Sequence, residues 1–142
     1  MITRLLLALT LVLPALGCGP RDRGLELQDA VRAYNQRLRW SAFEQASAFV
    51  AAEKRAAWLA SRTANAAGLH LTDVQVIRLG NPDPGTKSVD VLVALSWYRM
   101  PDTRVQSATW AQTWQEIEGR WRLTDEKAVE LPPAPPPAEQ WP

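Results

Sequence analysis

The chain has 142 residues, a formal net charge of +1, seven tryptophans, one histidine and one cysteine. This length suits one small domain, which buries roughly two-thirds of its unfolded surface. The near-zero charge argues against nucleic acid as a partner, because phosphate backbones are bound by basic faces. A single thiol cannot form an internal disulfide and a lone histidine does not make a metal site, so we expect neither metal nor cofactor.

The first residues have the organisation of an export signal. Arg4 precedes an apolar run from Leu5 to Leu16. As a helix this run would be about 18 Å long, well short of the ~30 Å hydrocarbon core of a bilayer. Pro14 interrupts the helix before a zone of small residues, as secretory signals require. We therefore expect residues 1–17 to direct export and not to span a membrane.

The segment Ala15-Leu16-Gly17-Cys18 resembles the lipid-attachment motif of bacterial lipoproteins. The resemblance implies cleavage before Cys18 and acylation of this cysteine with chains such as palmitate, each buried CH₂ adding ~0.8 kcal/mol of membrane affinity. That family usually has Leu and then a small residue where Ala15 and Leu16 stand, so an ordinary secretory signal is the alternative. Gly19 replaces the Asp of inner-membrane retention signals, which by the same resemblance indicates the outer membrane, with the domain in the periplasm.

The exported part divides into three segments by composition. Residues 18–24 form a short polar tether, residues 25–130 a folded domain and residues 131–142 a proline-rich tail. The tail, Leu131 to Pro142, is expected to be extended polyproline II.

The first half of the domain has helical periodicity. Apolar residues in 4-3-4 spacing predict a helix over Glu26–Arg39; they are Leu27, Val31, Tyr34 and Leu38. Ser41-Ala-Phe-Glu44 matches a capping box, which predicts a second helix with Ser41 as its N-cap that continues through Phe49 and Val50. An alanine-rich third helix is expected over Ala51–Asn65, ending near Gly68.

The second half alternates with a period of two. Leu71–Leu79 and Val89–Tyr98 are predicted strands. A turn at Pro101-Asp102 would pair Val93 with Trp110 and Val91 with Gln112. A hairpin turn at Glu118-Gly119 would pair Ile117 with Arg120, Glu116 with Trp121 and Trp114 with Leu123. After the last strand, Asp125, Glu126 and Glu130 are expected to form a solvated exit.

These two hairpins agree about the faces of the sheet. One face collects Val91, Val93, Leu95, Trp97, Trp110, Trp114, Trp121 and Leu123, and the other collects Thr113, Gln115, Arg120 and Arg122. A slip of one residue in either hairpin would mix the two sets, which supports this register.

Helices followed by a curved antiparallel sheet with one apolar face define an α+β domain. This order, together with the closing Trp114–Leu123 hairpin, resembles the nuclear-transport-factor-like fold over residues 25–130; the cystatin fold is the rival. The resemblance implies a conical cavity between sheet and helices, and dimerisation through the exposed sheet face. Thr113, Gln115, Arg120 and Arg122 would then contact a second copy or an envelope protein.

Two polar residues, Gln112 and Glu116, share the tryptophan face. In the resembling fold they would line a pocket with Tyr34, Trp97, Trp110 and Trp114, where an apolar environment could make Glu116 a general base. The alternative places Glu116 in water at the sheet edge, Gln112 against a helix terminus and the tryptophans in the core. His70, at a helix-to-strand junction, is expected to lie in a loop or to be partly exposed, with a role as general base as the other interpretation.

Together these patterns predict a lipid-anchored periplasmic protein that acts as a binding or interaction module of the cell envelope, without catalysis. Its first partner would be membrane lipid, reached through acylated Cys18. The alternative is a small-ligand binder, or an isomerase- or hydrolase-like enzyme that uses the cone cavity.

Overall fold

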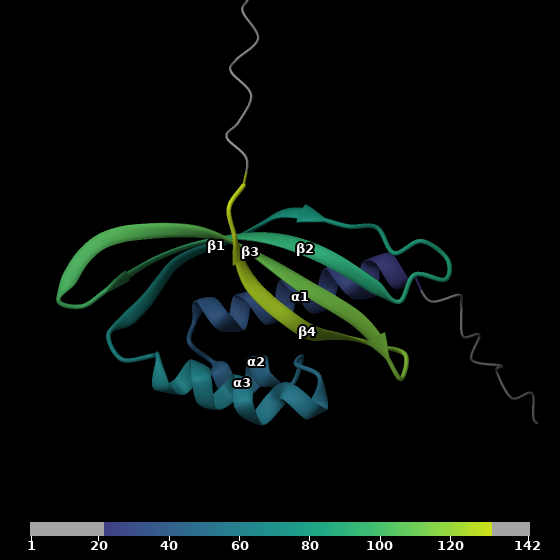
Figure 1. Ribbon diagram of the computed structural model, residues 1–142, viewed down its shortest axis with the longest axis horizontal. Coiled ribbons are helices and arrows are strands. Elements are labelled where there is room, and N and C mark those ends of the chain that lie inside the picture. Colours follow the sequence, from purple (N-terminus) through teal and green to yellow (C-terminus); the bar gives the residue numbers. More distant parts are fainter. Residues whose placement is uncertain (1–21, 132–142) are drawn as a thin grey trace, which may run out of the picture.

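The computed structural model describes residues 22–131 as three helices followed by one four-stranded sheet (Figure 1). The elements are α1 (Arg23–Arg39), α2 (Phe43–Ser47), α3 (Ala52–Ala64), β1 (Leu69–Leu79), β2 (Ser88–Arg99), β3 (Asp102–Ile117) and β4 (Arg120–Val129). The predicted export signal, Cys18, residues 18–21 of the tether and the proline-rich tail after Leu131 lie outside the described residues, whereas the last tether residues, 22–24, form the cap and first turn of α1. Within residues 22–131, no helix is long and apolar enough to cross a membrane.

The helices lie together on one side of the curved sheet (Figure 1). The strands are antiparallel in the order β1-β2-β3-β4. The core lies between these layers and combines one face of α1 with the inward face of the sheet: Leu27, Val31, Tyr34, Leu38, Val91, Val93, Leu95, Trp114, Trp121 and Leu123. The predicted α+β class is therefore confirmed.

Helix α1 has clear signals at both ends. Asp22 is its N-cap, and the carboxylate accepts the N–H groups of Gly24 and Leu25 at 3.0 and 3.1 Å. This cap starts the helix three residues before the predicted Glu26. At the other end Arg37 and Arg39 lie in the last turn, where cations complement the helix dipole.

Ser41 ends α1 and does not cap α2, so the predicted capping box is wrong. Its φ is +54°, and its N–H donates to the Leu38 carbonyl at 2.9 Å while the N–H of Ala42 donates to Arg37 at 2.9 Å. These two bonds satisfy the last carbonyls of α1 and form a Schellman motif with Ser41 in the left-handed position. The N-cap of α2 is Ala42, which makes no side-chain cap bond.

The second helix is also shorter than predicted, because the chain after Ser47 joins the sheet. Val50 bridges Leu123 in parallel, the N–H of Leu123 donates to Phe49 at 2.8 Å, and the N–H of Ala51 donates to Leu123 at 2.9 Å. This short segment covers part of the edge of β4, which would otherwise leave backbone groups unpaired. Helix α3 then runs as predicted, within one residue at each end.

Both predicted hairpin registers are confirmed. Val93 pairs with Trp110 and Val91 with Gln112 across β2 and β3. Across β3 and β4, Ile117 pairs with Arg120, Glu116 with Trp121 and Trp114 with Leu123. The turn residues Glu118 and Gly119 have φ values of 51° and 72°, as a two-residue type I′ turn requires.

The predicted solvated exit is wrong for Glu126, because β4 continues to Val129 and contains a bulge at Thr124; Asp125, which is also part of β4, and Glu130, which follows it, are exposed as predicted. Trp114 pairs with Leu123 but the next residue, Thr113, pairs with Asp125, which leaves Thr124 as the extra residue. A one-residue bulge exchanges the two faces of all that follows. Glu126 therefore lies opposite Gln112 on the inner face, where an unbroken ladder would have placed Asp125.

Candidate functional site

A cluster of polar side chains lies between the helices and the inner face of the sheet. We call Asn35, Arg62, Gln112 and Glu126 the buried polar cluster. Glu126, whose side chain is 7% exposed, forms an ion pair with Arg62 of α3. Its Oε2 also accepts the indole N–H of Trp58 at 3.3 Å, and its Oε1 accepts Nε2 of Gln112 at 3.1 Å. The carboxylate is thus held by donors from α3 and β3.

Gln112 connects Glu126 to helix α1. Its Nε2 donates to Oδ1 of Asn35 at 2.8 Å, and its Oε1 accepts Nδ2 of Asn35 at 3.2 Å. The indole N–H of Trp114 donates to the same Oε1 at 3.3 Å. Asn35 in turn donates to the Val31 carbonyl at 2.9 Å, in the middle of α1. Gln112 therefore binds helix α1 through a side chain in the middle of the helix. The alternative interpretation had expected it to bind a helix terminus.

Tyr34 is the central aromatic residue of this region. Its ring centroid lies 5.6 Å from that of Trp114 and 5.9 Å from that of Trp58. The side chain is fully buried, and the hydroxyl has no hydrogen-bond partner among the described residues. Burial raises the pKa of Tyr34 well above its usual value, and the negative charge of Glu126 raises it further. The phenol therefore remains neutral at any physiological pH.

A groove of about 650 Å³ opens above the Arg62–Glu126 pair, between α3 and the sheet. We call it the α3 groove; it is lined by Val50, Glu53, Lys54, Ala57, Trp58, Ser61, Arg62, Asn65, Arg99, Trp110, Leu123, Thr124, Asp125 and Glu126. The Arg62 guanidinium lies 5.4 Å from the ring centre of Trp58 and 5.5 Å from that of Trp110. Although burial alone would lower the pKa of Arg62, the neighbouring Glu126 raises it above its usual value, so the guanidinium is charged.

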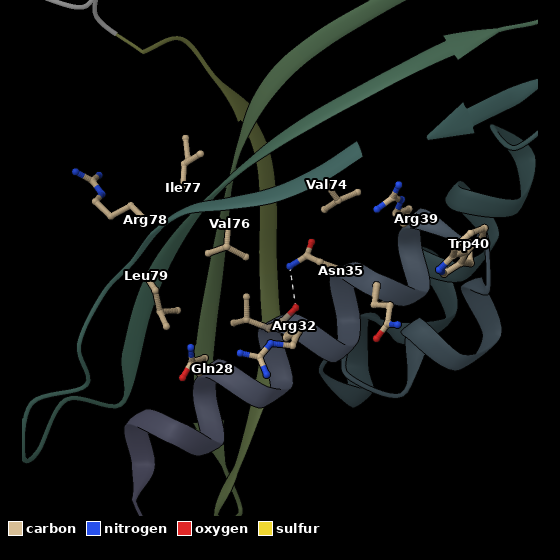
Figure 2. Close-up of a pocket in the computed structure, with 12 residues that line it drawn as sticks. Gln28, Arg32, Asn35, Arg39, Trp40, Val74, Val76, Ile77, Arg78 and Leu79 are labelled. Atoms are coloured by element: carbon tan, nitrogen blue, oxygen red, sulfur yellow. Dashed lines mark hydrogen bonds between the residues drawn. The ribbon is translucent and has the colours of Figure 1, made fainter. Parts of the chain in front are cut away.

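A second groove, of about 700 Å³, lies between α1 and the edge strand β1 (Figure 2). We call it the α1–β1 groove; its lining is Gln28, Val31, Arg32, Asn35, Gln36, Arg39, Trp40, Val74, Val76, Ile77, Arg78 and Leu79. The two grooves share no lining residue, but Asn35 reaches the second one and Glu126 the first. The buried polar cluster therefore extends through the core from one groove to the other.

The six residues predicted from the sequence as a pocket do not meet in one place. Tyr34, Gln112 and Trp114 meet in the core and are at most 1% exposed, so side chains fill this part of the cone. Trp110 lines the α3 groove, and Trp97 is a half-buried residue packed against the core.

Glu116, the sixth, lies at the far end of β3. It forms an ion pair with Arg23 at 2.5 Å, and its side chain is 27% exposed. Arg23 also donates to the Thr86 carbonyl at 2.6 Å and lies 5.5 Å from the ring centre of Trp121. Glu116 thus joins the start of α1 to the sheet. His70 is exposed in β1 and stacks on Tyr98 with ring centroids 4.9 Å apart, remote in the sheet from Glu116.

The four residues proposed for contact with a second copy share the outer face of the sheet, as predicted. Thr113 donates its hydroxyl hydrogen bond to Asp90 at 2.9 Å, and Gln115 is exposed on the same outer face of the sheet. Arg120 and Arg122 lie near the start of α3 and line a smaller groove there, and Arg122 donates to the Ala48 carbonyl. Arg122 pairs with Gln115 and Arg120 with Ile117 across β3 and β4, so the two arginines lie on the same outer face as Thr113 and Gln115, at its β4 side.

Sequence reasoning missed Arg62, Glu126, Asn35 and Trp58. Trp58 and Arg62 are four residues apart on α3, a spacing that places them on one helix face. This spacing was the one sequence pattern that could have indicated that the two side chains act together. Glu126 gave no signal, because its orientation depends on the bulge at Thr124. Within residues 22–131, no group of histidine, cysteine or acidic side chains could hold a metal ion.

The helix-on-sheet arrangement defines a nuclear-transport-factor-like α+β cone, and solved structures with this fold are similar. No protein-family model and no curated protein matches the sequence. An NTF-2 like protein of unknown function from Shewanella oneidensis has a TM-score of 0.55 at 9% identity, over 74% of this chain and 97% of that one.

Two further structures show the same fold. A protein of unknown function with a cystatin-like fold from Nostoc punctiforme has a TM-score of 0.51 at 19% identity, over 79% of this chain and 92% of that one. An epoxide hydrolase of M. tuberculosis has a TM-score of 0.51 at 15% identity, over 71% and 83%. At these identities the similarity concerns the fold.

Proposed function

We propose that this protein is a lipid-anchored binding module of the bacterial cell envelope, which takes a small organic ligand in its α3 groove. The anchor is Cys18, acylated after export and facing the periplasm from the outer membrane. The proposal of location rests on the sequence alone: the apolar run after Arg4 and the single cysteine at its end.

The observation that carries the binding role is the charged Arg62–Glu126 pair at the floor of an aromatic groove. A buried ion pair is weak evidence for stability, because apolar residues of similar volume stabilise a core equally well. Aromatic walls with a few fixed polar groups are typical of ligand sites, and about 650 Å³ lies within the usual range of ~300–1,000 Å³.

The charges around the groove indicate the class of ligand. The lining contains three basic side chains, Lys54, Arg62 and Arg99, and the three acidic ones Glu53, Asp125 and Glu126. Such a balance favours an uncharged or zwitterionic ligand. We propose a flat, mostly apolar molecule that lies on Trp58 and Trp110 and directs a polar group to the exposed part of Arg62.

The arrangement of titratable groups favours binding over catalysis. The Glu126 carboxylate already accepts hydrogen bonds from Arg62, Trp58 and Gln112. The Glu116 carboxylate is paired with Arg23 in the same way. Neither carboxylate is therefore free to accept a proton from a ligand. The outer face of the sheet, with Thr113, Gln115, Arg120 and Arg122, is our proposed contact surface for a second copy or an envelope protein.

A groove-filling substitution tests the binding site. Ala57 is exposed on α3 and lines the groove, whereas Ala56 is exposed on α3 and does not. The neutral aromatic dye N-phenyl-1-naphthylamine should bind the wild-type chain saturably, and Ala57→Trp should weaken binding at least about tenfold. Ala56→Trp is the matched control and should bind normally. No saturable binding, or equal loss in both variants, would contradict the proposal.

A further inference from the structure

The α1–β1 groove has a one-sided charge, although the whole chain carries only +1. Its lining contains the three arginines Arg32, Arg39 and Arg78 and no aspartate or glutamate. In the α3 groove, by contrast, acidic and basic side chains are equal in number. The α1–β1 groove is therefore selective for negative charge in a way that its neighbour is not.

Carboxylates of the protein neutralise these arginines only weakly. The nearest carboxylate of Arg32 is Asp29 at 3.9 Å, and both side chains are more than two-thirds exposed, so their attraction is weak. Arg39 lies 5.8 Å from the ring centre of Trp40. Among the described residues, neither Arg39 nor Arg78 has a carboxylate within ion-pair distance.

The floor of the groove is apolar and only partly covered. Val74, Val76 and Leu79 of β1 point toward α1 (Figure 2), yet Val76 remains 44% exposed. Trp40, at the end of α1, is 73% exposed at one end of the groove. At the bulge between Val76 and Arg78, the side chains of Ile77 and Arg78 point away from the helix (Figure 2).

The positions of the arginines fit a ligand with one charged end. Arg32 and Arg39 lie on α1 seven residues apart, hence about 10 Å along the helix. Between them β1 offers the aliphatic side chains of Val74, Val76 and Leu79, whereas its own Arg78 points away from α1 (Figure 2). An alkyl chain lying on Val74, Val76 and Leu79 would thus bring a terminal carboxylate to one of the guanidinium groups, which form strong hydrogen bonds with carboxylates.

We infer that the α1–β1 groove binds a single-chain amphiphile with an anionic head group, such as a long-chain fatty acid. The groove volume of about 700 Å³ is sufficient for one such molecule. This inference goes beyond the ligand proposed for the α3 groove, shares no lining residue with it and can fail independently of it.

The test uses residues 18–142 with Cys18→Ser, which retain the whole described domain and its core. Dodecanoate below its micellar concentration is titrated calorimetrically. We expect saturable 1:1 binding that is at least about tenfold tighter than binding of dodecyltrimethylammonium, which has the same chain and the opposite charge. Binding of dodecanoate should also shift the emission of Trp40, and Trp40→Phe should remove that shift.

Charge-removing variants locate the site. The double variant Arg32→Gln/Arg39→Gln should weaken dodecanoate binding about tenfold, since each exposed ion pair contributes a few-fold. Arg104→Gln, an exposed arginine of β3 outside the groove, is the control and should have no effect. All substituted side chains are exposed, so folding should be preserved, and circular dichroism checks this.

Three results would overturn the inference: equal affinity for the two amphiphiles, unchanged binding in the double variant, or no saturable binding of dodecanoate. An extended peptide of alternating valine and glutamate is titrated in parallel. If this peptide binds and dodecanoate does not, the groove is a protein-docking site and the amphiphile assignment is wrong.

Discussion

The Arg62–Glu126 pair provides a quantitative test of how the core is organised. Glu126→Gln would remove the negative charge and leave the Arg62 guanidinium, 26% exposed, between two tryptophans without a counter-ion. Breaking a fully buried pair costs about 3–5 kcal/mol, and partial exposure of Arg62 reduces this to about 2–3 kcal/mol. Arg62→Met would leave the less exposed Glu126 charged, with a destabilisation of about 3 kcal/mol.

The double variant Arg62→Met/Glu126→Gln should be much less unstable than the two single effects together. No charge remains, the amide introduced at position 126 keeps an oxygen for the indole N–H of Trp58, and methionine fills the space between the rings. We expect a loss of about 2–3 kcal/mol, against about 5–6 kcal/mol for the two single effects together, and hence a coupling energy of about 3 kcal/mol. Urea unfolding at pH 7, followed by tryptophan fluorescence, measures all four proteins, and the m-values must agree. Single effects that add within about 0.5 kcal/mol would refute a coupled buried pair.

Three other substitutions test separate features. Tyr34→Phe removes a buried hydroxyl without a partner, so the free energy of unfolding at pH 7 should stay constant or rise by up to about 1 kcal/mol; a loss above about 1 kcal/mol would show that the hydroxyl is hydrogen-bonded. In the wild type the unfolded chain ionises this phenol near its usual pKa, whereas the folded chain keeps it neutral to higher pH. The free energy of unfolding of the wild type should therefore fall as pH rises above about 10. In Tyr34→Phe this part of the pH dependence should be absent. Ser41→Gly should stabilise the fold by about 0.5–1 kcal/mol in thermal unfolding, since Ser41 has a positive φ, and Ser107→Gly in a strand should not. Cys18→Ser should abolish labelling with radioactive palmitate and release the protein from the membrane fraction; unchanged membrane association would exclude the lipid anchor.

The sequence predicted the local elements because their periodicity is strong. The 4-3-4 spacing of Leu27, Val31, Tyr34 and Leu38 gave α1, and all four are buried. The alternation in β2 and the two turns gave the registers, because each turn geometry fixes one pairing and the apolar face permits no slip. The α+β class followed from the order of these elements.

The failures involve residues whose role depends on a distant part of the chain. Ser41 satisfies the capping-box pattern, but the unpaired carbonyls of α1 compete for the same turn and determine its conformation. Val50 has the apolar spacing of a helix, yet the open edge of β4 takes it into the sheet. In both cases a local propensity of about 1 kcal/mol gives way to hydrogen bonds that only the folded chain provides.

By itself the sequence determined the fold class, the registers of the β2–β3 and β3–β4 hairpins and which face of the sheet is apolar, because short-range periodicity and turn geometry encode all three. The tertiary structure alone decided the site. The bulge at Thr124 turns Glu126 inward to meet Arg62 of α3, and the incomplete cover of β1 by α1 leaves a groove with three arginines. Neither feature has a periodic signal, since each depends on how elements distant in the sequence meet across the core.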